Sequence, residues 1–191
     1  MMKRKALVAL VGGVALGTIG TAAAATDLRV VSHVDLGRYV GTWYEIASIP
    51  TSFQSFCTGG TTATYTLLPD GKIEVTNQCY TASGEQKKAI GRAWVADPAT
   101  NAKLKVSFVS FLGFWLFSAD YWIIDLGPNY EYAVVGHPSR NYGWILSRTP
   151  TLSEDVLAGI RSRLAGQGYD VSRFRMTDQS RFTPEATGET S

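Results

Sequence analysis

Gly41-Thr42-Trp43-Tyr44-Glu45-Ile46 opens a series of strand-like segments, and Trp144-Ile145-Leu146-Ser147-Arg148-Thr149-Pro150 closes it about 105 residues later. Between these two stretches apolar and polar residues alternate with a period of two, as over residues 61–68, which is typical of half-buried strands. Short turns such as Pro69-Asp70-Gly71 separate the segments. Eight strands joined in this way predict an all-β barrel or sandwich. The predicted strands cover residues 43–49, 61–68, 72–78, 89–95, 103–108, 121–126, 131–135 and 142–148.

A helical pattern follows the last predicted strand. Thr151-Leu152-Ser153-Glu154 reads as a capping box, and Gly166 and Gly168 are stop signals. The apolar residues between them form one stripe, so we expect a helix that packs on the outside of the sheet. The stripe consists of Val156, Leu157, Ile160 and Leu164. A short extended piece, Val171 to Met176, can add to the sheet, and the polar residues 178–191 are predicted to be disordered.

The first 25 residues have the layout of a secretory signal peptide. A basic start precedes an apolar run and a small-residue stretch that ends at Ala25, after which we expect cleavage. A transmembrane anchor is the alternative, but the apolar run is shorter than the ~20 residues that a membrane span needs. No cysteine stands at the cleavage site to carry a lipid, so we expect an exported protein, periplasmic or secreted, without a lipid anchor. Residues 26–34 then lead into a single domain predicted over 35–177.

The charge of the chain argues against an anionic partner. The formal net charge is +2, from 18 basic and 16 acidic residues. Removing Lys3, Arg4 and Lys5 with the signal leaves 15 basic and 16 acidic residues, a net charge of −1. A near-neutral mature chain lacks the basic excess of a nucleic-acid-binding protein, so no nucleic-acid partner is expected. The aromatic content of 12% favours β structure and recognition through apolar surface.

Taken together, the two framing stretches resemble the lipocalin family. Gly41-Thr42-Trp43 is similar to the family's G-x-W motif, and Arg148 stands where the family's arginine packs across that tryptophan and closes the barrel floor. The longer match, over residues 38–46 and 144–150, is similar to the bacterial lipocalins related to apolipoprotein D. The resemblance covers roughly residues 35–176. It implies an eight-stranded antiparallel up-and-down barrel with one C-terminal α-helix packed outside.

Two features depart from the family pattern. The usual bacterial member carries a lipoprotein cysteine, which this chain lacks, so the resemblance does not extend to an outer-membrane anchor. The family's middle motif, Thr-Asp-Tyr, is also absent. Leu126-Gly127-Pro128-Asn129-Tyr130-Glu131-Tyr132 occupies that turn, and only its tyrosines match the motif. The resemblance therefore depends on the two framing stretches.

In the lipocalin arrangement four loops surround the open end of the barrel, over residues 50–59, 81–88, 109–119 and 137–141. The third loop is nearly all apolar, and the first adds two phenylalanines. Exposed apolar surface of this kind often marks a contact with ligand or membrane, so we expect transient contact with a bilayer. Inward folding of these side chains is the alternative. The residues predicted for this mouth and membrane loop are Phe53, Phe56, Phe111, Phe114 and Trp115.

The two cysteines fall at the same end of neighbouring strands in this arrangement. Cys57 precedes the second strand and Cys79 ends the third, so the Cα separation of a disulfide is attainable. An exported protein meets an oxidising compartment, which favours the bond over two buried free thiols. We therefore predict a disulfide that pins a mouth loop against the barrel wall.

The alternation of side chains along each strand predicts the cavity lining. With Trp43 and Arg148 at the floor, Glu45 and Ala47 should share the inward face of their strand. A carboxylate near the floor should pair with a cation, so we expect Glu45 to contact Arg148 or Arg92. A barrel of this size holds one small ligand, and aromatic walls suit a long apolar one. The predicted ligand-binding residues, for each of which plain packing is the alternative, are Ala47, Tyr65, Val75, Val106, Phe108 and Trp144.

Three classes of function compete. The resemblance implies binding, storage or transport of a hydrophobic ligand, such as a fatty acid or lysophospholipid, in envelope maintenance or stress. An envelope interaction protein that uses the apolar loop is the second class. A lipid-modifying enzyme is the weakest, because no metal spacing, phosphate loop or G-x-S-x-G is present and the only histidines are His33 and His137. We predict no catalytic residue, metal or cofactor, and a monomer or homodimer.

Overall fold

The computed structural model describes residues 27–183, so the predicted signal peptide and its cleavage after Ala25 lie outside the described residues. The strands within that range are β1 (Gly41–Ser48), β2 (Gly59–Leu67), β3 (Ile73–Tyr80), β4 (Gln86–Val95), β5 (Lys103–Ser107), β6 (Val109–Phe111), β7 (Phe114–Leu116), β8 (Ala119–Leu126), β9 (Tyr132–Gly136), β10 (Gly143–Ser147) and β11 (Arg175–Met176). The helices are α1 (Leu36–Tyr39), α2 (Glu154–Gly166) and the 3-10 turns η1 (Ser52–Gln54), η2 (Val171–Arg173) and η3 (Ser180–Phe182).

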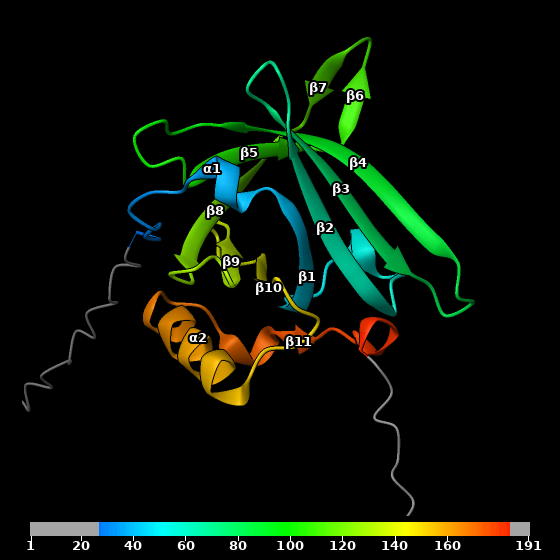
Figure 1. Cartoon of the computed structure of the whole chain (residues 1–191), viewed down its shortest axis with the longest axis vertical. Helices are drawn as coiled ribbons and strands as arrows, with labels where there is room; N and C mark the ends of the chain where they lie inside the picture. The colour runs from blue at the N-terminus through cyan, green and yellow to red at the C-terminus, as the bar shows by residue number, and fades with distance from the viewer. Residues whose placement is uncertain (1–26, 184–191) are drawn as a thin grey trace, which may run out of the picture.

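Eight strands form a closed antiparallel barrel (Figure 1). The sheet has the order β10-β9-β8-β5-β4-β3-β2-β1-β11, and an additional pairing between β10 and β1 closes it. The short strand β11 adds to β1 through Ala47 and Ser48. The predicted up-and-down barrel with one C-terminal α-helix is confirmed.

A hairpin interrupts the barrel between β5 and β8. Residues 109–119 were expected to be a loop, but β6 and β7 pair there from Val109–Leu116 to Phe111–Phe114. Leu112 and Gly113 form the turn, with φ of 48° and 82°, which is the two-residue geometry that matches the twist of a hairpin. The hairpin projects from the barrel at the top of Figure 1. Residues 108–117 are nearly all apolar and do not alternate with polar residues, so the sequence did not indicate half-buried strands there.

Helix α2 covers the outside of the barrel, along the bottom of Figure 1. The hydroxyl of Ser153 accepts a hydrogen bond from the backbone N–H of Val156, so Ser153 caps the helix, and Thr151, the first residue of the predicted box, does not. Leu157, Ile160 and Leu164 are buried in a cluster between the helix and the barrel wall. This outer cluster is separate from the inner cluster that fills the barrel around Trp43.

A bulge in β1 decides which residues reach the cavity. Glu45 pairs with Leu146, but the next pair is Ala47 with Ile145, so Ile46 is an extra residue on β1. The extra residue reverses the alternation, and Ala47 turns into the outer cluster with no exposed surface. The prediction that Ala47 faces the cavity is therefore wrong.

The C-terminal segment closes a gap in the barrel wall. β1 and β2 pair only from Gly41–Tyr65 to Tyr44–Thr62, and beyond that point the strands separate. The side-chain amide of Gln179 bridges the gap, donating to the backbone oxygens of Glu45 and Thr61 at 2.8 Å each. The disorder predicted from residue 178 onward is therefore wrong for residues 178–183, and residues 184–191 lie outside the described residues.

Candidate ligand-binding site

The structure brings the two predicted floor residues together. Arg148 lies over the buried ring of Trp43, with the guanidinium carbon 3.7 Å from the ring centre. Its Nη1 donates to the backbone oxygen of Thr42, and its Nη2 donates to the backbone oxygens of Arg38, Tyr39 and Val40. The indole N–H of Trp43 also donates to Tyr39, at 2.8 Å. The floor is thus held by hydrogen bonds to the backbone around α1.

Above the floor lies a cavity of about 750 Å³. This volume falls within the range of sites that enclose small molecules. Five of the six predicted ligand-binding residues line it, namely Tyr65, Val75, Val106, Phe108 and Trp144. Phe53 and Phe56 from the first mouth loop line it as well.

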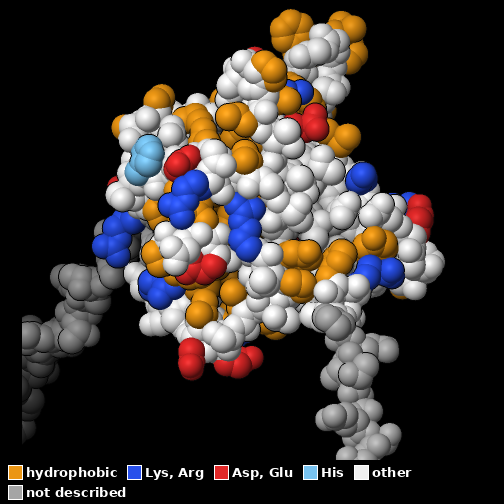
Figure 2. Space-filling model, in the orientation of Figure 1, with side chains coloured by type: hydrophobic (Ala, Val, Ile, Leu, Met, Phe, Trp, Pro, Cys, Tyr) orange, Lys and Arg blue, Asp and Glu red, His pale blue; other side chains and the backbone are white. Residues whose placement is uncertain are grey.

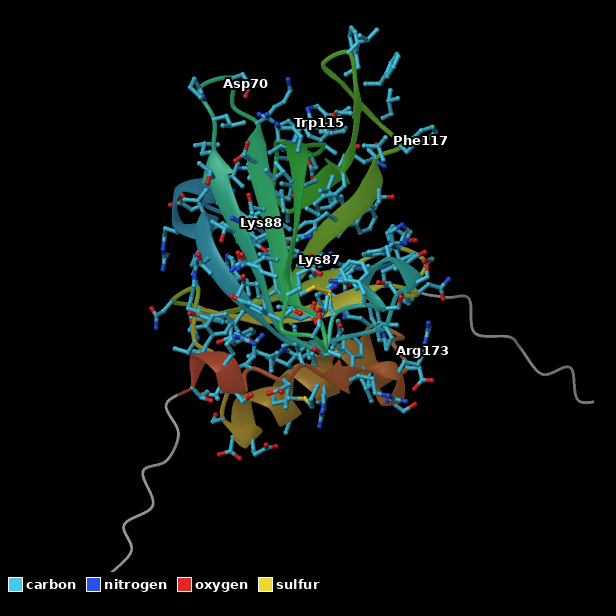
Figure 3. All side chains as sticks on the ribbon, turned by 90° about the vertical axis from the view of Figure 1, so that its right-hand side faces the viewer. Asp70, Lys87, Lys88, Trp115, Phe117 and Arg173 are labelled. Atoms are coloured by element: carbon cyan, nitrogen blue, oxygen red, sulfur yellow. A yellow bond between two sulfur atoms is a disulfide. The ribbon has the colours of Figure 1, made fainter. Side chains whose placement is uncertain are left out.

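Further lining residues were not among the predicted set. At the inner side these are Tyr121, Val135 and Leu146, and toward the mouth they are Lys87, Lys88, Asp120, His137 and Tyr142. Lys87 and Lys88 lie on the face of the barrel that Figure 3 turns toward the viewer. The alternation in β8, β9 and β10 indicates the inner residues, whereas the mouth residues come from the start of β4, the start of β8 and the segment between β9 and β10.

Three buried tyrosines share hydrogen bonds near the floor. The hydroxyl of Tyr121 lies 2.8 Å from those of Tyr39 and Tyr65. Burial raises the pKa of Tyr65 to about 12 and those of Tyr39 and Tyr121 well above the ordinary value. All three hydroxyls therefore stay protonated at neutral pH. Since Tyr65 and Tyr121 line the cavity, they supply polar groups at its inner end.

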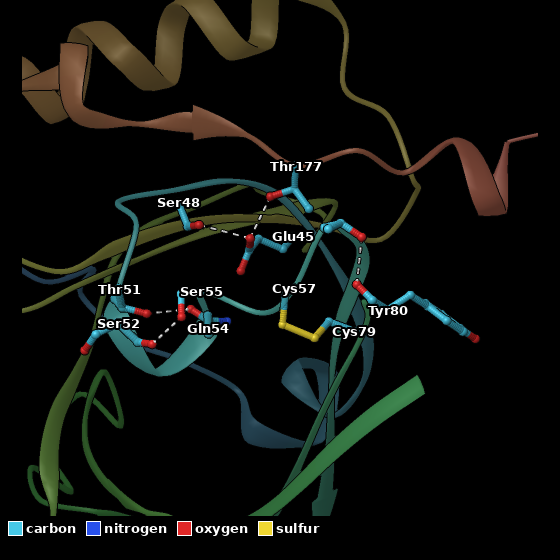
Figure 4. Close-up of a disulfide and its surroundings, with 11 residues drawn as sticks. Glu45, Ser48, Thr51, Ser52, Gln54, Ser55, Cys57, Cys79, Tyr80 and Thr177 are labelled. Atoms are coloured by element: carbon cyan, nitrogen blue, oxygen red, sulfur yellow. Dashed lines mark hydrogen bonds between the residues drawn. A yellow bond between two sulfur atoms is a disulfide. The ribbon is translucent and has the colours of Figure 1, made fainter. Parts of the chain in front are cut away.

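Glu45 is a buried carboxyl group in the cavity wall, with 7% of its surface exposed. Its Oε1 accepts hydrogen bonds from the hydroxyls of Thr177 at 2.6 Å and Ser48 at 3.0 Å (Figure 4). Burial raises the pKa of Glu45, and these hydrogen bonds oppose the rise. The expected pairing with Arg148 or Arg92 is wrong, because Arg148 binds backbone oxygens and Arg92 lies over the ring of Trp115.

A second, smaller cavity of about 300 Å³ lies beside the first, where the C-terminal segment passes β1 and β2. Hydroxyl-bearing side chains make up much of its wall, including Ser48, Thr51, Ser55, Thr58, Thr61 and Thr177. Both cavities are lined by Glu45, Gln54, Cys57 and Thr61, so the two spaces meet at these side chains.

The predicted disulfide between Cys57 and Cys79 is confirmed (Figure 4). The bond joins the end of the first mouth loop to β3, with Cα atoms 5.6 Å apart. Through this bond the barrel wall holds the loop that carries Phe53 and Phe56 over the cavity.

The β6–β7 hairpin carries a cluster of exposed apolar side chains. Phe111, Leu112, Phe114 and Phe117 are 65 to 86% exposed, and Figure 2 shows hydrophobic side chains gathered at the projecting tip. Trp115, which was predicted for the membrane loop together with Phe111 and Phe114, differs from these exposed side chains, because the guanidinium carbon of Arg92 in β4 lies 5.6 Å from the centre of its ring. It holds the hairpin against the barrel, while its neighbours remain in solvent.

Among residues 27–183, no group of three or more His, Cys, Asp or Glu side chains could hold a metal ion. No helix in this range has the length and apolar character to cross a membrane.

A closed barrel with a floor tryptophan, an arginine across it and an internal cavity defines the class of small β-barrel proteins built around a ligand site. The chain belongs to the lipocalin family, since residues 34–179 match the family model described as a lipocalin-like domain. Lipocalins bind small hydrophobic ligands. The predicted resemblance to bacterial lipocalins and apolipoprotein D is confirmed by the relatives described next.

Relatives of known name cover most of the chain. Temperature-induced lipocalin-1 of Arabidopsis thaliana is 41% identical over 163 residues, which is 84% of this chain and 87% of that protein. The outer membrane lipoprotein Blc of Escherichia coli K12 is 40% identical over 153 residues, covering 80% and 83%. Mouse apolipoprotein D is 31% identical over 159 residues, covering 79% and 80%.

Solved structures share the fold at lower identity. Insecticyanin from Manduca sexta has a TM-score of 0.66 at 22% identity and covers 81% of this chain and 86% of its own. The amine-binding protein of Rhodnius prolixus, in its tryptamine complex, has a TM-score of 0.56 at 20% identity, with 79% and 84% covered. At such identities the similarity is one of fold alone.

Proposed function

We propose that the chain binds a lipid with one acyl chain, such as a fatty acid or lysophospholipid, and stores or transports it in the cell envelope. The observation that carries the proposal is the cavity of about 750 Å³, whose walls are mostly aliphatic and aromatic. Its polar groups include tyrosine hydroxyls near the floor, Glu45 in the wall, and Lys87, Lys88 and Asp120 toward the mouth. An elongated apolar ligand with a polar end fits that distribution.

The hairpin supports transient contact with a membrane surface. Leu112 occupies a left-handed backbone position with φ of 48°, which costs a leucine roughly 1–2 kcal/mol. That conformation holds an 80% exposed apolar side chain at the tip. Strain that keeps apolar surface in water favours a binding role for that surface. In this proposal the hairpin rests on a bilayer while the ligand enters or leaves the barrel.

The cellular setting follows from the disulfide and from the names of the relatives. A Cys57–Cys79 bond suits an oxidising compartment, so the protein is exported to the periplasm or beyond. One relative is named as an outer membrane lipoprotein and another as temperature-induced. We assign the chain to envelope maintenance under stress by analogy with these names, and we assign it no catalytic role.

An envelope interaction protein is the second candidate. The exposed apolar side chains of the hairpin favour it, because a partner protein could cover the same surface as a bilayer. Under this alternative the barrel is a scaffold and its cavity holds no specific lipid.

Native mass spectrometry of the full chain, purified gently from its own cells, tests the choice. We expect a co-purified lipid that organic extraction identifies. Val75→Trp fills the cavity and should abolish lipid retention, whereas Thr76→Trp, one residue along β3 and facing outward, should retain it. An empty wild-type barrel that takes up no fatty acid and purifies with a protein partner would support the second candidate instead.

A further inference from the structure

Glu45 occupies the junction between the two cavities. Its carboxyl group lines both of them, at the point where β1 and β2 separate. On one side lies the large apolar cavity, and on the other lies the smaller one with its hydroxyl groups. A molecule with an apolar chain and a polar end could therefore place its polar end beside this carboxyl group.

No cation among residues 27–183 forms an ion pair with Glu45. Residues 27–183 contain four ion pairs, and none of them includes Glu45. Arg175 lines the smaller cavity, but its Nη1 donates to the backbone oxygens of Ser172 and Phe174. The other charged or titratable residues that line the two cavities are Asp178, Lys87, Lys88, Asp120 and His137. Of these, Lys87 pairs with Glu85, and Asp120 pairs with Lys105.

The carboxyl group is nevertheless held in place. The hydroxyls of Ser48 and Thr177 both donate to Oε1, and Figure 4 shows the side chain between them and the disulfide. Gln54 contributes a further side-chain hydrogen bond. A carboxylate has about four acceptor sites, so the group can still accept from a ligand. A buried carboxylate without a counter-charge is costly, and a cationic ligand would remove that cost.

From this arrangement we infer that Glu45 binds the ammonium group of an amphiphilic ligand whose chain lies in the large cavity. The inference rests on the proposed lipid binding and specifies the head group. An ammonium group donates charge-assisted hydrogen bonds to the carboxylate, and hydroxyls of the smaller cavity accept others. A ligand with an anionic end at this position would be repelled by Glu45. At this position the protein therefore favours a positively charged head group.

Three ligands that share one chain test the inference: dodecylamine, dodecanol and dodecanoate, each titrated by calorimetry into the full mature chain at neutral pH. We expect the wild-type protein to bind dodecylamine roughly tenfold or more tighter than dodecanol, as a charge-assisted hydrogen bond predicts. Dodecanoate should bind more weakly than the amine. In Glu45→Gln the preference for the amine should vanish, while the affinity for dodecanol changes little.

A matched control makes the same substitution outside the cavity. Glu74 lies on β3 opposite Arg92 and does not line either cavity, so Glu74→Gln should retain the preference for the amine. Lysophosphatidylethanolamine and lysophosphatidic acid then identify the source of the ammonium group. Preference for the first, lost in Glu45→Gln, points to a lipid head group, and preference for dodecylamine alone points to a long-chain amine.

The outcomes separate this inference from the proposed function. If none of the three twelve-carbon ligands binds, lipid binding in the cavity fails. If dodecanol binds and dodecylamine binds no tighter, the inference is overturned and the proposed function stands. The same holds if Glu45→Gln keeps the preference for the amine. The comparison of amine with alcohol in the wild-type protein needs no variant, so it decides the matter even if Glu45→Gln does not fold.

Discussion

The two ends of the barrel differ in whether their side chains find partners within the protein. At the floor, Arg148 and Trp43 direct their N–H groups to backbone oxygens of residues 38–42. Away from the floor, a cavity lies within the barrel, and the β6–β7 hairpin outside it leaves Phe111 and Phe114 largely exposed. Groups that are satisfied internally contribute to folding, and groups that are not remain available for binding. Substitutions at the floor should therefore lower stability, and those at the mouth should change binding.

The largest effect is expected for Arg148→Ala. It removes hydrogen bonds to four backbone oxygens and the stacking on Trp43, so we expect a loss of roughly 3–4 kcal/mol in the free energy of unfolding. Urea unfolding followed by fluorescence measures it. Arg163→Ala on α2 is the control, since its partly exposed pair with Asp125 is worth at most about 1 kcal/mol. Equal losses in the two variants would contradict the special role of the floor.

The disulfide is the one covalent link at the mouth, and its removal gives the next largest effect. Cys57→Ala with Cys79→Ala opens a loop of 22 residues in sequence separation, which corresponds to about 3 kcal/mol. Lipid binding should also weaken, because Phe53 and Phe56 lose their anchor. Thermal unfolding and lipid titration measure the two effects. The wild-type protein under reducing conditions should behave in the same way, and unchanged lipid affinity would show that the loop holds its position without the bond.

The difference between the two ends also explains what the sequence could predict. The floor is encoded in two short stretches whose residue types and spacing are visible without the structure. The eight strands were visible for a similar reason, because each has an alternating face. The disulfide followed from placing Cys57 and Cys79 on neighbouring strands, and the structure confirms it.

The features that the sequence did not reveal depend on a single inserted residue or on contacts between distant parts of the chain. The bulge at Ile46 turned Ala47 outward, and nothing in the local pattern marks it. The polar composition after residue 177 indicated disorder, but Gln179 finds two backbone oxygens at the gap between β1 and β2. The partners of Glu45 were expected among the arginines, yet hydroxyls lie closer.

Glu45 provides a test at the wall between the two ends. Its pKa in the folded protein is raised by burial above the ordinary value of 4.5, so the folded state binds more protons than the unfolded state just above that pH. The wild-type protein should therefore lose stability relative to Glu45→Gln as pH rises from about 4.5 through the raised pKa. The slope should be at most about 1.4 kcal/mol per pH unit. Urea unfolding across this range measures the difference, and parallel profiles for the two proteins would contradict the direction of the shift.

The smallest effect on stability is expected at the hairpin. Phe111 and Phe114 are 65% and 72% exposed, so replacing both with Ser should change the free energy of unfolding by less than about 0.5 kcal/mol. Binding to lipid vesicles should nevertheless fall sharply, because the apolar tip is the proposed contact. Co-sedimentation with vesicles measures the loss. Ile90→Ser is the matched control, since Ile90 is 56% exposed on β4 and lies outside the hairpin, and it should sediment like the wild-type protein.

Trp115→Ser separates support of the hairpin from contact with the membrane. The ring of Trp115 packs over Arg92, so its loss should destabilise the protein more than the loss of either exposed phenylalanine. If vesicle binding falls only in Trp115→Ser, the orientation of the hairpin matters and its exposed tip does not. If vesicle binding persists in the double phenylalanine variant, the mouth does not contact membranes through this tip. Of the groups that remain free to bind, only those that line the cavity would then have a binding role.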